Sequence, residues 1–152
     1  MLRADALGAL PGVTDEVGTL SDTFRTIGID IGGTAIKIAV VWSDGRVVES
    51  RQIPTDGDAG PEAAAGRILA CIDTLRREHG LETREMRALG IDSAGIVDGA
   101  NNLVLDAPNL RSWERYPLAV RLGSALGLPA FLENDVNAMA YGEWHCGAGR
   151  GT

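Results

Sequence analysis

The hydrophobic pattern of the chain begins with two β-branched runs, over residues 27–31 and 35–41, which are joined by Gly32-Gly33-Thr34. Two such runs on either side of a glycine pair predict a β-hairpin. A third strand is predicted over residues 46–53, after a turn of the Asp-Gly type at Asp44-Gly45. The first three strands are therefore expected to form an antiparallel meander.

Beyond residue 60 the spacing of the apolar residues becomes helical. Residues 61–79 carry one apolar stripe, with a proline near the start and Gly80 directly after the end, which is typical of a helix. That stripe consists of Ala65, Ile68, Leu69, Ile72 and Leu75. The later pattern predicts strands over 87–92 and 129–133 and helices over 117–127 and 136–145.

The order of these elements, βββαβαβα, predicts a mixed five-stranded α/β sheet, because crossover helices between successive strands make those strands parallel. Residues 1–23 mix Gly, Pro, Asp and Thr with scattered apolar residues and are expected to form an irregular leader. This leader is too short and too poor in basic residues for a winged-helix DNA-binding domain.

The composition, with 45% hydrophobic and 23% charged residues in a chain of 152, is that of a globular domain with its own core. A net charge of −7 argues against a nucleic-acid partner. No apolar run reaches transmembrane length and no secretory signal is recognisable, so a cytoplasmic protein without a membrane partner is expected. Cys71 and Cys146 form no CxxC pair, and only two histidines are present, so free thiols and no metal site are expected.

The turn between the first two strands has the chemistry of a phosphate-binding turn. Gly32 and Gly33 lack Cβ atoms, so their backbone N–H groups are accessible to a phosphate. Thr34 adds a hydroxyl donor, and Asp30 supplies a carboxylate that can hold Mg²⁺ through water. An ordinary glycine-rich hairpin fits the same residues, and the turn alone does not separate the two interpretations.

Two further segments follow strands whose carboxyl ends meet at one edge of an open α/β sheet, where ligands collect. The first contains Gly95, in a small segment that a substrate can approach, although a plain strand-to-loop turn fits as well. The second is Asn134-Asp135, where Asp135 can accept a proton from a substrate hydroxyl. Either residue is also a good N-cap for the following helix. Asn109 lies in a rigid turn that can direct its amide at a polar ligand, or it forms an Asx-turn.

With these residues in place, the chain resembles the amino-terminal half of a ROK-family sugar kinase of the glucokinase type. That family belongs to the actin–hexokinase–Hsp70 superfamily, whose fold is ribonuclease-H-like. The resemblance rests on four motifs in order: Ile29-Asp-Ile-Gly-Gly-Thr34; Ala88-Leu-Gly-Ile-Asp-Ser-Ala-Gly-Ile-Val-Asp98; Pro108-Asn-Leu110 with Trp113; and Glu133-Asn-Asp-Val-Asn137 followed by Gly142-Glu143 and Gly147-Ala-Gly149.

The resemblance implies transfer of the γ-phosphoryl group of ATP, with Mg²⁺, to a hydroxyl of a hexose such as glucose or an N-acetylhexosamine. It implies that Asp135 is the general base that activates the sugar hydroxyl. The residues implied to hold sugar hydroxyls are Asn134, Asn109 and Gly95. Those implied to meet the phosphates of Mg-ATP are Asp30, Gly32, Gly33 and Thr34.

Kinases of this family continue for roughly another domain, with a second phosphate loop, an adenosine pocket and a Cys-rich zinc motif. By that resemblance, residues 24–134 form an actin-like ATPase lobe and residues 135–152 begin a second lobe that is truncated here. The isolated chain is therefore expected to be inactive. Two alternatives stay open. One is a sugar-sensing module of a ROK repressor, and the other is a pseudokinase half-domain that needs a partner lobe. The identity of the sugar, polyphosphate as donor, and a homo-oligomeric state also stay open.

Overall fold

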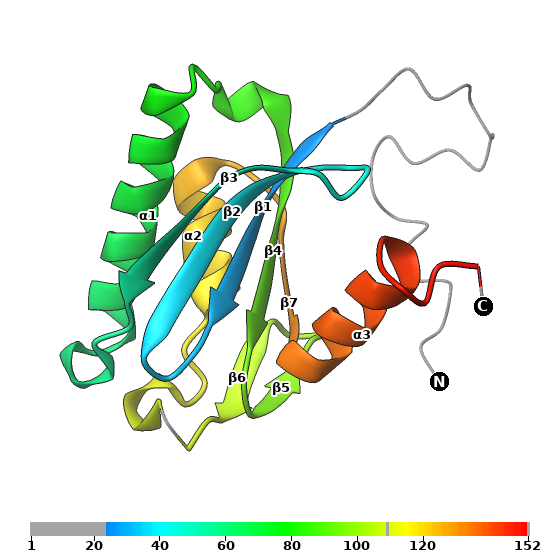
Figure 1. Cartoon of the computed structure of the whole chain (residues 1–152). Coiled ribbons are helices and arrows are strands. Elements are labelled where there is room, and N and C mark those ends of the chain that lie inside the picture. Colours follow the sequence, from blue (N-terminus) through cyan, green and yellow to red (C-terminus); the bar gives the residue numbers. More distant parts are fainter. Residues whose placement is uncertain (1–23, 109, 152) are drawn as a thin grey trace.

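The computed structural model of the protein describes residues 24–108 and 110–151. Its centre is one five-stranded sheet in the order β3-β2-β1-β4-β7 (Figure 1). The strands are β1 (Arg25–Ile31), β2 (Ala35–Trp42), β3 (Val47–Pro54), β4 (Met86–Ser93) and β7 (Ala130–Asn134). The first three form an antiparallel meander, while β4 runs parallel to β1 and β7 runs parallel to β4. The predicted mixed five-stranded α/β fold is confirmed.

Two helices, α1 (Pro61–Glu78) and α2 (Leu118–Leu126), cover one face of this sheet. Helix α1 packs on β2 and β3, and α2 packs on β4 and β7. The buried stripe of α1 contains Ile68, Ile72 and Leu75, as the helical spacing predicts. The core between helices and sheet consists largely of alternate strand residues, such as the buried isoleucines of β1 and β2.

A second, two-stranded sheet was not expected from the sequence. It is a hairpin of β5 (Ile96–Asp98) and β6 (Leu103–Asp106), which directly follows β4. Strands of three and four residues are too short to show a period of two, so the pattern of apolar residues gives no signal for them. Three short 3-10 helices complete the described chain, namely η2 (Gly57–Ala59), η3 (Thr83–Glu85) and η4 (Arg111–Trp113).

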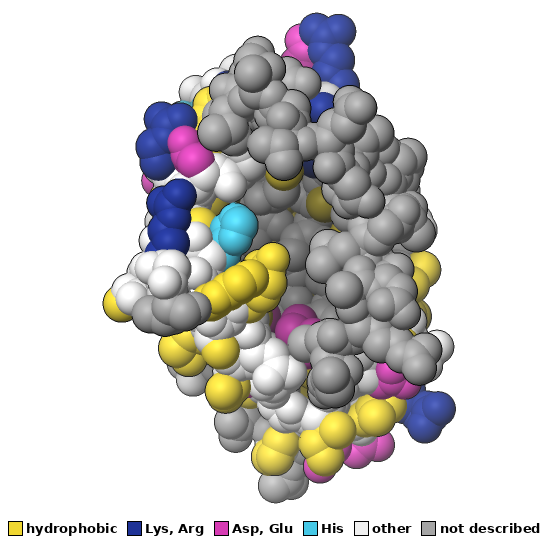
Figure 2. Space-filling model, turned by 90° about the vertical axis from the view of Figure 1, so that its right-hand side faces the viewer, with side chains coloured by type: hydrophobic (Ala, Val, Ile, Leu, Met, Phe, Trp, Pro, Cys, Tyr) yellow, Lys and Arg dark blue, Asp and Glu magenta, His cyan; other side chains and the backbone are white. Residues whose placement is uncertain are grey.

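Helix α3 (Asp135–His145) begins where β7 ends and has no buried residue. Figure 1 shows it away from the layer formed by α1 and α2. Large apolar side chains stand exposed along it, and Figure 2 shows hydrophobic groups on this side of the molecule. They are Val136, Met139, Tyr141 and Trp144, each more than half exposed. Among the described helices, none is both long and apolar enough to cross a membrane.

Candidate active site

Strands β1, β4 and β7 are parallel, so their carboxyl ends meet at one edge of the sheet. At that edge, at the lower end of the view in Figure 1, lie the turn between β1 and β2, the β5–β6 hairpin and the start of α3. The structure therefore brings together the described segments that the sequence analysis singled out. Asn109, also predicted there, lies outside the described residues.

The turn from Gly32 to Thr34 closes on itself through one backbone bond, in which the Gly32 N–H donates to the Ala35 carbonyl oxygen (3.1 Å). A Cβ atom at Gly32 would lie 2.9 Å from that same oxygen, so this position accepts only glycine without a backbone shift. Gly33 and Thr34 are exposed. The turn thus presents an exposed backbone and the Thr34 residue to solvent at the edge where ligands bind in open sheets.

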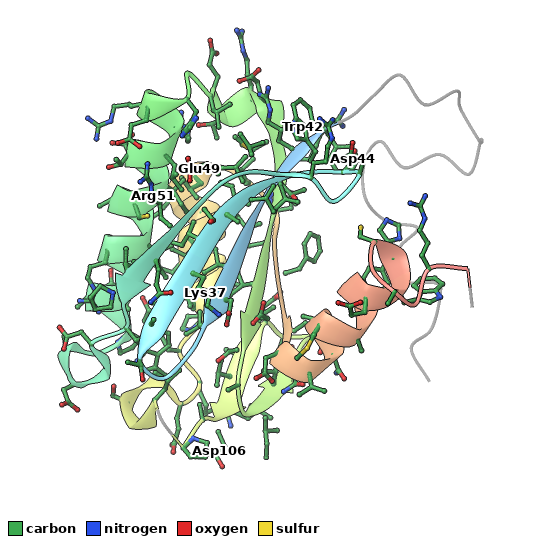
Figure 3. The ribbon with its side chains drawn as sticks, in the orientation of Figure 1. Lys37, Trp42, Asp44, Glu49, Arg51 and Asp106 are labelled. Atoms are coloured by element: carbon green, nitrogen blue, oxygen red, sulfur yellow. The ribbon has the colours of Figure 1, made fainter. Side chains whose placement is uncertain are left out.

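Asp30 lies on the face of the sheet that α1 and α2 do not cover. Its register partner on β2 is Lys37, whose Nζ donates to Asp30 Oδ2 at 2.8 Å. Figure 3 shows Lys37 on this uncovered face. The hydrogen bond to Asp30 is the main reason that the pKa of Lys37 is raised. Lys37 thus places one positive charge beside the Asp30 carboxylate on this face.

One row of polar side chains crosses the strands at this level. The Cα register pairs Lys37 with Asp30, Asp30 with Asp92, and Asp92 with Glu133, so these side chains share the uncovered face. Burial, followed by the nearby charges of Asp30 and Asp135, raises the pKa of Asp92 to about 7. A carboxyl group at Asp92 therefore keeps its proton far more readily than a solvated aspartate does.

Asp92 is a residue that the sequence analysis missed. In sequence it is a single acid between Ile91 and Ser93 in a predicted strand. Only the parallel register places it opposite Asp30 and next to the start of α3. Its signal was the repetition of an apolar-Asp pair, Ile29-Asp30 and Ile91-Asp92, at equivalent positions of neighbouring strands.

Asn134 is the N-cap of α3, which settles which member of the Asn134-Asp135 pair caps the helix. Its Oδ1 accepts hydrogen bonds from the N–H groups of Val136 (3.0 Å) and Asn137 (3.3 Å). Its Nδ2 donates to the carbonyl oxygen of Gly95 at 2.9 Å. The amide therefore ties α3 to the segment after β4, and its second N–H has no acceptor among the described residues.

Asp135 is the first residue of α3 and is half-buried. Its Oδ1 accepts from the Val136 N–H at 2.9 Å. Asp135 is close enough to Asp92 for its charge to contribute to the raised pKa of that group.

Gly95 joins β4 to β5 with a φ of 104°, a backbone conformation that residues with side chains rarely adopt. A Cβ atom at this position would collide with the carbonyl oxygen of Asp106 at the end of β6, which is labelled at the lower end of Figure 3. The glycine is needed because the hairpin lies directly against it. Its carbonyl oxygen, held by Asn134, faces the start of α3.

A metal site built from protein groups alone is not found in the described part of the chain, where no three or more His, Cys, Asp or Glu side chains form a group that could hold an ion. Both cysteines are free. Mg²⁺ bound with a nucleotide needs only one or two carboxylates, since water and phosphate oxygens complete its octahedron. Asp30, partly exposed beside the turn, fits that requirement.

Comparison with known proteins identifies the family to which the chain belongs. The family model described as "ROK family" matches residues 26–152, and the chain belongs to the ROK family. The described fold agrees, since a crystal structure of a ROK family glucokinase from Streptomyces griseus, in complex with glucose and AMPPNP, superposes with a TM-score of 0.72 at 38% identity. That match covers 84% of this chain and 38% of the other.

The curated relatives are sugar kinases. A glucokinase of Streptomyces coelicolor is 38% identical over 126 residues, which are 83% of this chain and 37% of that protein. An N-acetylmannosamine kinase of Salmonella typhi is 32% identical over 120 residues, which are 79% of this chain and 39% of the relative. The chain therefore spans less than two fifths of the length of these relatives.

Proposed function

We propose that this chain is the amino-terminal lobe of an ATP-dependent hexose kinase, with the sugar and the phosphates meeting at the carboxyl edge of β1, β4 and β7. The observation that carries the proposal is the convergence of the Gly32–Thr34 turn and Asp135 on that one edge. Phosphoryl transfer needs a phosphate cradle and a base for the attacking hydroxyl, and these two features have that chemistry.

In this proposal Asp135 accepts the proton of the sugar hydroxyl as the hydroxyl oxygen attacks the γ-phosphorus and the bond to the β-phosphate oxygen breaks. The start of α3 fixes the Asp135 carboxyl group, whose Oδ1 accepts from the Val136 N–H, at the edge where a general base is needed. The free N–H of the Asn134 amide and the backbone of Gly95 hold neighbouring sugar hydroxyls, and Asn109 is assigned the same role.

On the nucleotide side, Gly32, Gly33 and Thr34 hold the phosphates through backbone and hydroxyl donors. Asp30 would hold Mg²⁺ bound with ATP through water, and the ion would neutralise charge on the transferred group. Lys37 fixes the Asp30 carboxylate through their 2.8 Å ion pair, so that the carboxylate stays directed along the uncovered face of the sheet.

Glucose is the first candidate substrate and an N-acetylhexosamine the second, because the relatives include a glucokinase and an N-acetylmannosamine kinase. A cytoplasmic location without a nucleic-acid or membrane partner belongs to the same proposal. The isolated chain is proposed to bind ligands weakly and to turn over slowly or not at all, since a kinase must exclude water from the transferred phosphoryl group.

The test is a ligand titration followed by amide resonances of the chain. Mg-ATP is expected to shift Gly33 and Thr34, and glucose is expected to shift Gly95 and Asn134. The variant Asp135→Asn should retain both sets of shifts, because it keeps the helix start. Shifts by both ligands at residues far from this edge, or by neither ligand, would overturn the proposal.

A further inference from the structure

A buried threonine outside the predicted site contacts the turn from Gly32 to Thr34. Thr55 directly follows β3 and is completely buried, with 0% of its surface exposed. A buried hydroxyl needs a hydrogen-bond partner, and Thr55 directs its own at the turn between β1 and β2. Its Oγ1 donates to the carbonyl oxygen of Gly32 at 2.6 Å.

The backbone of the same residue holds the other side of the turn, since the Thr55 N–H donates to the carbonyl oxygen of Thr34 at 3.0 Å. One residue thus binds two carbonyl groups that flank Gly33. The turn is fixed from the β3 side at two points, in addition to its own bond between Gly32 and Ala35.

The first of these bonds has a geometric consequence for Gly33. In a planar trans peptide, the carbonyl of one residue and the N–H of the next point in opposite directions. Because the Gly32 carbonyl is held toward the buried Thr55, the N–H of Gly33 points the opposite way, and Gly33 is exposed. The hydroxyl of Thr55 therefore sets the direction of a donor at the surface.

Thr55 is itself fixed by α1. The guanidinium of Arg67 donates from Nη2 to the Thr55 carbonyl oxygen, and its Nη1 lies 3.8 Å from Asp56 Oδ2. A chain of contacts thus runs from α1 through Thr55 to the turn. Since α1 is packed on the sheet through its buried stripe, the turn is held against the core of the domain.

We propose that Thr55 is a positioning residue for phosphate binding, whose hydroxyl holds the Gly32–Gly33 peptide so that the Gly33 N–H faces the ligand, with Arg67 holding Thr55. This inference rests on the proposed function, because it assigns a phosphate ligand to the turn. It adds two residues that do not touch the ligand and act through the turn alone.

The experiment compares three variants of the chain. Thr55→Val removes the hydroxyl while nearly keeping the shape of the side chain, and Thr55→Ser restores the hydroxyl. The matched control is Thr74→Val, because the Thr74 hydroxyl also donates to a backbone carbonyl, that of Ala70 (2.9 Å), but on the exposed surface of α1.

The first measurement needs no ligand. Thr55→Val is expected to change the amide shifts of Gly33 and Thr34 and to speed hydrogen exchange of the Gly32 N–H. Thr55→Ser and Thr74→Val should leave these values close to those of the parent chain. Unchanged turn resonances in Thr55→Val would overturn the positioning role, whatever the chain binds.

The second measurement is the affinity for Mg-ATP, followed by the same resonances. Loss of one oriented donor is expected to raise the Kd about fivefold to tenfold in Thr55→Val, with recovery in Thr55→Ser. Affinity for glucose should not change in Thr55→Val, whereas a general loss of structure would weaken the binding of both ligands. A further outcome is that the turn changes as expected in Thr55→Val while the parent chain binds no Mg-ATP. In that case Thr55 positions the turn, but the proposed function and the phosphate role of the turn are wrong.

Arg67→Met keeps the inference testable if Thr55→Val does not fold. It leaves the threonine in place and removes the donor to the Thr55 carbonyl together with the ion pair to Asp56. The expected result is a smaller change at Gly33 and Thr34 than in Thr55→Val. Identical turn resonances in Arg67→Met and the parent chain would remove Arg67 from the proposal.

Discussion

At the scale of single residues, the candidate site contains an arrangement that folding alone does not favour. Asp30 and Asp92 are register partners on neighbouring strands, and like charges placed directly opposite destabilise a sheet. The ion pair of Asp30 with Lys37 and the retained proton of Asp92 relieve that repulsion. Arrangements that break a local rule in this way are typical of functional sites.

This arrangement predicts a pH dependence of stability. The pKa of Asp92 is raised from 3.8 to about 7 in the folded chain, so between about pH 4 and pH 7 the folded state holds a proton that the unfolded state has released. Stability from this group is therefore fully present below about pH 4 and falls as the pH rises toward about 7. Asp92→Asn should remove that fall, as measured by urea unfolding at pH 5 and pH 8.

The exposed Asp58 offers a control, because Asp58→Asn removes one negative charge away from the row. If Asp92→Asn and Asp58→Asn give the same difference in unfolding free energy between the two pH values, the assignment of the raised pKa to Asp92 is wrong.

Gly95 gives a second prediction at this scale. Gly95→Ala is expected to lower the free energy of unfolding by more than about 2 kcal/mol, because the added Cβ meets the Asp106 carbonyl and the φ of 104° is strained. Gly28→Ala is the control, since a Cβ atom there meets no atom within 4 Å. Equal denaturation midpoints for the two variants would contradict the close packing of the hairpin against Gly95.

At the scale of elements, the sequence predicts the helices and strands that are long enough to show a regular spacing of apolar residues. The β-branched runs and the helical stripe of α1 predict the five-stranded sheet and its covering helices, and the structure confirms them. The β5–β6 hairpin is not predicted because its strands are too short to show a period of two. The contacts of Thr55 and the raised pKa of Asp92 are not predicted because they depend on strand register and on contacts between distant segments, which a single sequence does not display.

Helix α3 depends on its cap more than α1 does, because it has no buried residue of its own. Asn134→Ala should therefore destabilise the chain by about 1–2 kcal/mol, since it removes the cap and the bond to Gly95. Asn134→Asp keeps an acceptor for the cap but lacks the Nδ2 donor.

The two variants separate the two functions of Asn134. Hydrogen exchange at Asn137, whose N–H donates to Asn134 Oδ1, should be protected in Asn134→Asp and fast in Asn134→Ala, while the Gly95 region should change in both. Loss of protection at Asn137 in Asn134→Asp would show that the cap does not hold the helix start in the way described.

At the scale of the whole molecule, the proposed site lies along one edge of the sheet. The turn from Gly32 to Thr34, the polar row that crosses the strands and the start of α3 meet at this edge, with an uncovered sheet face and an exposed apolar helix beside them. The relatives are more than twice as long as the part that this chain matches. The division at residues 134 and 135 stays a prediction, as do the roles assigned to individual site residues.

The proposed function predicts that purified residues 1–152 phosphorylate glucose slowly or not at all in the presence of Mg-ATP. A coupled assay for ADP, with the Asp135→Asn variant as background, measures this. Robust turnover that depends on Asp135 would show that this chain completes the active site without further residues or a partner.

The most direct test of the central claim is a chimera with the Streptomyces coelicolor glucokinase, in which the matched segment is replaced by the corresponding residues of this chain. The chimera is expected to phosphorylate glucose, and Asp135→Asn is expected to lower kcat by about 100-fold to 10,000-fold while the chimera stays folded. A folded chimera whose activity is unchanged by Asp135→Asn would contradict the proposed role of Asp135.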